Sequence, residues 1–239
     1  MEVRIFLGTQ NLVRGESRSR GTQKSAGQNS YPGHQIKKGL EFSFLFFSKF
    51  VKITIMRYKI AVSGASQVGD CVKDIEKISR EIGREISRLK CILITGATTG
   101  VPYFAAQGCK EAGGISIGFS PAASEISHRK VYKLPLDCFD VMVYTGFDYT
   151  GRNLLMTRAA DAVVVCCGRI GTLNEFTIAF EDRKPIGVLV GSGGTADLIK
   201  NLMRRPHRRG AKIIYDADPK TLVQKLIKLI KKQKGRKIN

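Results

Sequence analysis

The stretch AVVVCCGRIGTLNEF, residues 162–176, changes from an extended pattern to a helical one and decides the fold. Its first four residues are apolar and mostly β-branched, as in a fully buried strand. The following run TLNEFTIAFED, residues 172–182, has helical periodicity. Between them lie Gly168, Arg169 and Gly171. This turn is either a phosphate cradle with a carboxylate behind it or a plain connection between a strand and a helix.

The same alternation extends in both directions from this stretch. Buried-strand patterns occupy 59–64, 91–96, 114–119, 141–146, 162–168, 185–191 and 211–216, and helical patterns occupy 73–89, 101–112, 151–160, 172–182, 195–204 and 218–232. Strands that alternate with helices favour a parallel sheet covered on both faces. We therefore expect an α/β fold: a single doubly wound, Rossmann-like domain within 56–234, with a mainly parallel sheet of about seven strands and helices on both faces.

The ends of the chain differ from its middle. Residues 1–55 include a polar, Gly- and Ser-rich stretch, which predicts a disordered or spurious N-terminal extension before a Rossmann-like domain at 56–217. Residues 218–239 form a basic C-terminal helix and tail. The net charge of +20 divides into +6 for 1–55, +2 for 56–199 and +12 for 200–239. Basic ends favour a solvated surface, so nucleic acid is not the expected partner.

The six cysteines do not form a recognisable metal or disulfide pattern. No CxxC spacing occurs, and the adjacent Cys166 and Cys167 point to opposite faces of a predicted strand. Reduced, buried thiols in a cytoplasmic protein are the expectation, with no metal. No apolar run approaches the length of about 20 residues that crosses a bilayer, so no membrane partner is expected.

Four glycine-bearing turns follow predicted strands, at 63–70, 95–102, 145–153 and 167–172. The ends of parallel strands meet at one edge, and glycine turns before helices offer N–H groups to an anion. We expect a phosphorylated ligand there, bound by Gly64, Ser66, Gly96, Gly100, Gly168, Arg169, Gly171 and Thr172. No GxGxxG or GxxxxGK[ST] motif is present, which disfavours nicotinamide chemistry and ATP hydrolysis.

Two charged residues border these turns. Arg152 begins one predicted helix and Glu175 lies on the first turn of another. Arginine grips phosphate with a planar fork, and a fixed carboxylate stabilises a developing cation or activates water. Taken singly, Arg152 is better explained as a surface charge, and Glu175 as a charge at the start of a helix.

The segment from Arg152 to Glu175 resembles the LOG (Lonely Guy) family, near its molybdenum-cofactor carrier-like members. That family carries R-x-x-x-M-x-x-x-x-[AS]D-A before P-G-G-x-G-T-x-x-E, and the matching positions here are Arg152, Met156, Asp161, Ala162, Gly168, Gly171, Thr172 and Glu175. The resemblance implies a Rossmann-like homodimer that hydrolyses the N-glycosidic bond of nucleoside 5′-monophosphates, the phosphoribohydrolase reaction that activates cytokinins. It implies that Arg152 and Glu175 are catalytic and that Arg158 binds substrate, with no metal and no other cofactor.

Two departures from the family pattern keep a second function open. Cys167 stands where the family has proline, and Arg169 stands where it has its second glycine. Arg169 either adds a phosphate contact or fills the pocket and removes turnover. The chain is therefore expected to be a nucleoside 5′-monophosphate phosphoribohydrolase or a non-catalytic carrier of a nucleotide-like small molecule.

Overall fold

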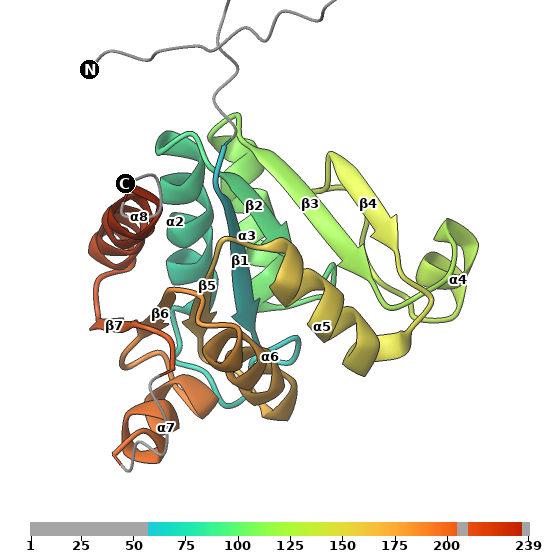
Figure 1. Ribbon diagram of the computed structural model, residues 1–239. Helices are drawn as coiled ribbons and strands as arrows, with labels where there is room; N and C mark the ends of the chain where they lie inside the picture. Colours follow the sequence, from blue (N-terminus) through green and yellow to red (C-terminus); the bar gives the residue numbers. More distant parts are fainter. Residues whose placement is uncertain (1–56, 205–209, 236–239) are drawn as a thin grey trace, which may run out of the picture. The chain divides into compact units, whose positions relative to one another are not determined.

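A sheet of seven parallel strands forms the centre of the molecule, in the order β4-β3-β2-β1-β5-β6-β7 (Figure 1). The computed structural model describes residues 57–204 and 210–235, so the predicted extension at 1–55 lies outside the described residues. The strands are β1 Lys59–Gly64, β2 Ile92–Thr95, β3 Ile115–Ser120, β4 Val141–Tyr144, β5 Ala162–Cys166, β6 Ile186–Leu189 and β7 Ile213–Asp216. The α/β fold class and all seven predicted strands are confirmed.

Helices cover both faces of this sheet. On one face lie α2 Ile75–Arg88, α3 Val101–Glu111 and α8 Pro219–Gly235, and on the other lie α5 Asp148–Ala159, α6 Ile170–Glu181 and α7 Gly194–Leu202. A short helix that the sequence analysis did not predict, α4 Glu125–Lys130, follows β3. Within the described ranges, no helix combines the length and apolar character needed to cross a membrane.

The strands alternate their side chains between two hydrophobic cores. Ile60 and Val62 pack with α2, α3 and α8, whereas Ala61 between them packs with α5, α6 and α7. Strand β5 is buried along its whole length, because it lies next to the central strand and has helices above and below. Burial on both faces explains its continuous apolar sequence.

The order in which strands are added to the sheet reverses at β1, although all strands run parallel. Strands β2, β3 and β4 follow one another outward from β1 on one side, and β5, β6 and β7 follow outward on the other side. The loops that leave β1 and β5 therefore diverge to opposite faces of the sheet. In doubly wound folds this divergence opens a crevice at the carboxyl ends of the two strands, where ligands bind.

Candidate functional site

A cavity of about 160 Å³ opens at this crevice. It is bordered by the ends of β1 and the loops that follow β1, β2 and β5, together with the first turns of α3, α5 and α6. Its lining residues are Val62, Gly64, Ala65, Ser66, Gly96, Thr98, Pro102, Tyr149, Arg152, Asn153, Arg169, Gly171, Thr172 and Glu175.

Arg152 and Glu175 meet at this cavity from two different helices. Arg152 comes from α5 and Glu175 from α6, and their Nη1 and Oε1 atoms lie 3.5 Å apart. Only 6% of Arg152 and 5% of Glu175 is exposed. The Nε atom of Arg152 is buried and has no hydrogen-bond partner among residues 57–204 and 210–235. The guanidinium therefore retains donor capacity that a ligand with anionic oxygen atoms can use.

Two neighbours orient the carboxylate of Glu175. The hydroxyl of Ser63, at the end of β1, donates a hydrogen bond to Oε2. The amide of Asn153 lies 2.9 Å from Oε1, and its nitrogen is assigned to face this oxygen because the reverse orientation would place two acceptors together. Burial raises the pKa of Glu175 above its ordinary value, while Arg152 and Ser63 act in the opposite direction. The result is a fixed carboxylate in a site of low polarity.

Gly96 makes room for the guanidinium. A Cβ atom at this position would lie 1.5 Å from Nη1 of Arg152. Arg152 thus lies against the backbone of the loop after β2, and the Tyr149 ring centroid is 5.9 Å from its Cζ atom. This close approach explains why glycine is needed at the carboxyl end of β2.

The turn after β5 leads directly into the N-terminus of α6. Gly168 has φ +102°, a conformation that favours glycine, and a Cβ there would meet Thr172 at 2.5 Å. No side chain caps the start of α6. Its first N–H groups therefore lack intrahelical partners at the edge of a cavity that Gly171 and Thr172 line. This arrangement suits an anion.

Arg169 lies at the mouth of the cavity and does not fill it. Its backbone has φ −129° and ψ −157°, so this position does not require glycine. Its Nη1 atom donates a hydrogen bond to Oε1 of Gln67, at 2.6 Å, in the loop after β1. The side chain thus spans the two loops that border the crevice.

Most residues predicted as ligand-binding lie around this cavity. Gly64, Ser66, Gly96, Arg152, Arg169, Gly171, Thr172 and Glu175 all line it. Gly100 and Gly168 lie next to the lining residues but not among them. A Cβ at Gly100 would meet the carbonyl oxygen of Ala65 at 2.3 Å. These two glycines shape the turns and do not line the cavity.

Arg158 lies apart from the other predicted site residues. Its side chain is exposed and pairs with Asp182 at 3.3 Å, and it does not line the cavity. Arg158 lies six positions after Arg152 along α5, a distance of about 9 Å in a helix, and this offset turns it to a different face. The structure thus places Arg158 near the C-terminal end of α5, whereas the cavity borders the N-terminal half of this helix.

Sequence reasoning missed several residues of the site. Ser63 carries a detectable signal, because it is a buried polar residue in the otherwise apolar run KIAVSG. Asn153 and Tyr149 share α5 with Arg152, and helical spacing of three from Arg152 places Tyr149 beside it. Thr98 and Pro102 line the cavity from the loop and helix that follow β2, and no motif marks them.

The expectation that all cysteines are reduced is wrong. Cys71 and Cys167 form a disulfide, whereas Cys91, Cys109, Cys138 and Cys166 are free and buried. The two bonded residues are 96 positions apart in the sequence. They meet because β1 and β5 are neighbours in the sheet, so the loops that follow these strands begin side by side.

Comparison with known proteins agrees with this architecture. A structural-genomics protein, TM1055, is 28% identical and superposes with a TM-score of 0.64. The match covers 72% of this chain and 99% of TM1055. The molybdenum cofactor binding protein of Rippkaea orientalis is 24% identical, with a TM-score of 0.60 over 74% of this chain and 99% of its own. A protein of Archaeoglobus fulgidus is 25% identical over 131 residues, which are 55% of this chain and 81% of that protein.

The family model of SLOG cluster4 matches residues 57–223, which include every strand and all the residues that line the cavity. This match confirms the resemblance to LOG-like Rossmann proteins. The chain belongs to the SLOG cluster4 family.

Proposed function

We propose that the cavity binds a nucleoside 5′-monophosphate and that Arg152 and Glu175 hydrolyse its N-glycosidic bond. The products are the free base and ribose 5-phosphate. The observation that carries this proposal is the buried Arg152–Glu175 pair, in which the Nε atom of Arg152 has no partner in the part of the chain that the structure describes. A buried guanidinium with an unused donor is costly unless a ligand satisfies it.

Each part of the site has a role in this reaction. The uncapped start of α6 and Arg152 bind the phosphate and the sugar, because both present N–H donors to the cavity. Cleavage of the glycosidic bond develops positive charge on the ribose, as in glycoside hydrolysis. The carboxylate of Glu175 stabilises this charge and orients the attacking water, while Ser63 and Asn153 hold the carboxylate in place.

The decisive experiment measures release of free base from a panel of nucleoside monophosphates by chromatography. Glu175→Gln is expected to lower the rate by about 10²-fold or more, because it removes one preorganised electrostatic group. Glu181→Gln is the matched control, since Glu181 is exposed at the far end of the same helix and does not line the cavity. Absence of base release by the native protein, or a full rate in Glu175→Gln, refutes the enzymatic proposal.

A carrier function is the second candidate. It is favoured by Arg169, which places a cation at the mouth of the cavity, and by the structural likeness to a molybdenum cofactor binding protein. A carrier retains its ligand through purification, whereas a hydrolase releases its products. Native mass spectrometry of freshly purified protein therefore distinguishes them: a bound small molecule together with no base release supports the carrier.

We also infer that the chain forms a homodimer, as the family resemblance implies. Several apolar side chains are exposed around α5, among them Phe147, Leu154 and Leu155. By contrast, Phe176 and Ala179 of α6 are buried in the core and are not available for pairing. Light scattering coupled to size-exclusion chromatography tests the inference, and a monomeric mass at high protein concentration contradicts it.

A further inference from the structure

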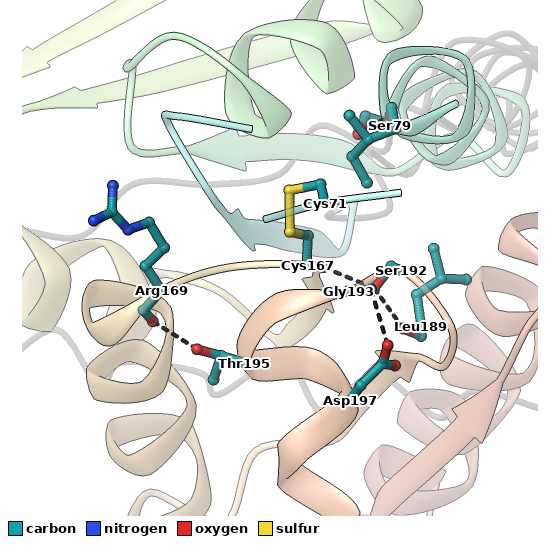
Figure 2. Close-up of a disulfide and its surroundings, with 10 residues drawn as sticks. Cys71, Ser79, Cys167, Arg169, Leu189, Ser192, Gly193, Thr195 and Asp197 are labelled. Carbon is teal, nitrogen blue, oxygen red and sulfur yellow. Dashed lines mark hydrogen bonds between the residues drawn. A yellow bond between two sulfur atoms is a disulfide. The ribbon is translucent and has the colours of Figure 1, made fainter. Parts of the chain in front are cut away.

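The Cys71–Cys167 disulfide joins two of the loops that border the cavity, those after β1 and β5 (Figure 2). Cys167 is the first residue after β5, and Cys71 lies in the loop between β1 and α2. Cys167 has φ +54°, a value that the ring of proline forbids. The turn at the position where the family resemblance has proline is thus built differently in this chain.

A third loop, between β6 and α7, packs around the same disulfide (Figure 2). The amide of Cys167 donates to the hydroxyl of Ser192 at 2.8 Å, and its carbonyl accepts from the amide of Ala196 at 2.9 Å. Cys71 forms an isolated bridge with Gly193. The glycine-rich run after β6 therefore supports the loops of the site without lining the cavity.

Arg169 belongs to one of the two loops that the disulfide joins, and its side chain is hydrogen-bonded to the other. Arg169 lies two residues after Cys167, and Gln67, which accepts its hydrogen bond, lies four residues before Cys71. The carbonyl of Arg169 also accepts a hydrogen bond from the hydroxyl of Thr195, at 3.0 Å. The position of this cation at the cavity mouth consequently depends on the distance between the two loops.

We propose that the Cys71–Cys167 disulfide positions Arg169 over the cavity, so that the affinity for an anionic ligand depends on the redox state of these two cysteines. The inference rests on the proposed binding of a phosphorylated ligand. In the oxidised protein Arg169 contributes a preorganised positive charge at the mouth. When the bond is broken, the loop that carries Gln67 is no longer covalently tied to the turn that carries Arg169, and this contribution is weakened.

The reduction is an exchange with an external dithiol. A thiolate of the dithiol attacks the sulfur of Cys71, which is half-buried, whereas Cys167 is fully buried. The S–S bond breaks and Cys167 leaves as a thiolate that takes up a proton. The second thiol of the reagent then displaces Cys71 from the mixed disulfide. Two electrons pass to the protein, and the dithiol becomes a disulfide.

The test measures the affinity for adenosine 5′-monophosphate by calorimetry before and after treatment with dithiothreitol. Alkylation and mass spectrometry establish that the free thiols rise from four to six. Reduction is expected to weaken binding about tenfold, a typical coupling between two sites. Adenosine, which lacks the phosphate, is expected to show no such change. A purely structural disulfide lowers the melting temperature but leaves the affinity of the folded protein unaltered, and this result overturns the proposal.

Three variants sharpen the test. The double variant Cys71→Ser with Cys167→Ser is expected to bind like the reduced protein and to ignore dithiothreitol. Arg169→Ala is expected to bind weakly in both redox states, because the disulfide acts through this side chain. Cys138→Ser, a free cysteine outside the lining of the cavity, retains the full redox response. A full redox effect in Arg169→Ala contradicts the proposal.

Hydrogen exchange separates this inference from the proposed function. If adenosine 5′-monophosphate binds in neither state, the proposed ligand class is wrong, and the positioning role is then judged from the amides of 65–72 and 168–172. Reduction is expected to accelerate exchange in both segments while the strands remain protected. Unchanged exchange in these segments overturns the positioning role.

Discussion

At the scale of single residues, the position of Arg152 depends on a glycine, Gly96. The guanidinium is buried, its distance of 3.5 Å to Glu175 makes a weak ion pair, and the space it occupies exists only because residue 96 has no side chain. Burying a charge with incomplete partners is costly to the fold. The site therefore holds a guanidinium that a bound anion would stabilise.

Gly96→Ala is expected to abolish ligand binding and to preserve the fold. The new methyl group would overlap Nη1 of Arg152 and force the guanidinium out of the cavity. Gly69→Ala is the matched control, because no heavy atom lies within 4 Å of a Cβ built at Gly69. Calorimetry with adenosine 5′-monophosphate measures both variants, and circular dichroism checks their folding. Tight binding by Gly96→Ala contradicts the assigned position of Arg152.

Glu175 predicts a particular dependence of activity on pH. Burial raises its carboxyl pKa above the ordinary 4.5, and the proposed reaction needs the carboxylate. The value of kcat/KM should therefore fall as the pH drops through this raised pKa, with an acid limb above about pH 4.5. Because the folded protein keeps this proton to a higher pH than the unfolded chain does, the same group lowers stability as the pH rises through that window. A profile that stays flat down to about pH 4 contradicts the assignment.

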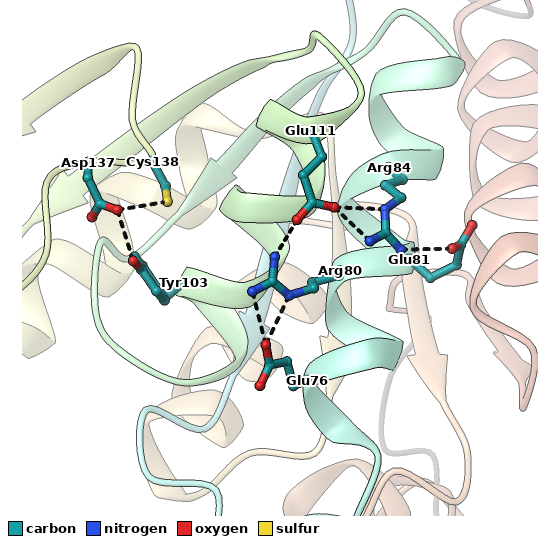
Figure 3. A network of polar contacts seen from close by, with 8 residues as sticks. All are labelled: Glu76, Arg80, Glu81, Arg84, Tyr103, Glu111, Asp137 and Cys138. Atoms are coloured by element: carbon teal, nitrogen blue, oxygen red, sulfur yellow. Dashed lines mark hydrogen bonds and ion pairs between the residues drawn. The ribbon is translucent and has the colours of Figure 1, made fainter.

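At the scale of elements, charged side chains join α2 to α3 (Figure 3), and Lys220 of α8 pairs with Glu81 of α2. Glu111 of α3 accepts hydrogen bonds from Arg80 and Arg84 of α2, and both arginines also pair with acids of α2. Arg84 is the largest influence that holds the pKa of Glu111 below its usual value. Figure 3 shows the side chains of Arg80, Arg84 and Glu111 meeting between α2 and α3.

Glu111→Gln is expected to lower the free energy of unfolding by about 0.5 kcal/mol, since these side chains are partly exposed and screened by solvent. The difference should shrink at high salt. It should also disappear as the pH falls through the lowered pKa, because the wild-type stabilisation requires the carboxylate. Urea denaturation measures the effect. Glu125→Gln serves as the control, because among the described residues Glu125 forms an ion pair with exposed Arg129 of α4 alone. An equal loss of stability in this variant would show that the network contributes nothing beyond an isolated pair.

The elements also show where prediction from sequence succeeds. Strands such as β5 are predictable because burial on both faces leaves a continuous apolar run. Helix α4 was missed because its six residues, EISHRK, are too short to show periodicity. Its one signal is Ser124, which caps the helix by accepting a hydrogen bond from the amide of Ser127. Helix α8, set apart in sequence as a basic tail, buries Leu222, Leu226 and Ile230 in the core that includes α2.

At the scale of the whole molecule, the strand order decides which distant residues become neighbours. Arg152 and Glu175 could be paired from sequence because a family pattern contains both. The Cys71–Cys167 bond could not, because it depends on β5 lying beside β1, and no local pattern specifies that neighbour. The loops that follow neighbouring strands meet whatever their separation in sequence. Contacts of this kind become visible only once the order of the sheet is known.

The thiols provide a direct check on this arrangement. Burial raises the pKa of Cys91 to about 11 and the pKa values of Cys109 and Cys166 to about 12, so these residues have almost no thiolate near neutral pH. The native oxidised protein should therefore react very slowly with a thiol reagent. Denaturation without reductant should expose four thiols, and denaturation with reductant should expose six. Six thiols without reductant would disprove the disulfide.

The disulfide should also stabilise the entire domain. It closes a loop across 96 positions, and a bond of this span restricts the unfolded chain by about 4.7 kcal/mol in the chain-entropy model. Urea denaturation with and without dithiothreitol should show a loss of stability of up to this size. The double variant Cys71→Ser with Cys167→Ser should have the same stability as the reduced protein. Equal stability of the oxidised protein, the reduced protein and the double variant would contradict the expectation.

The central position of β1 has a consequence for biosynthesis. Its partner β2 follows after about thirty residues, but its other partner β5 ends only at Cys166. A nascent chain that has released β1 to β4 from the ribosome therefore carries a half-sheet whose open edge is β1, with the buried apolar residues Ile60, Ala61 and Val62. Unpaired apolar edges promote aggregation. Chaperone demand should peak in this interval and end when β5 closes the sheet.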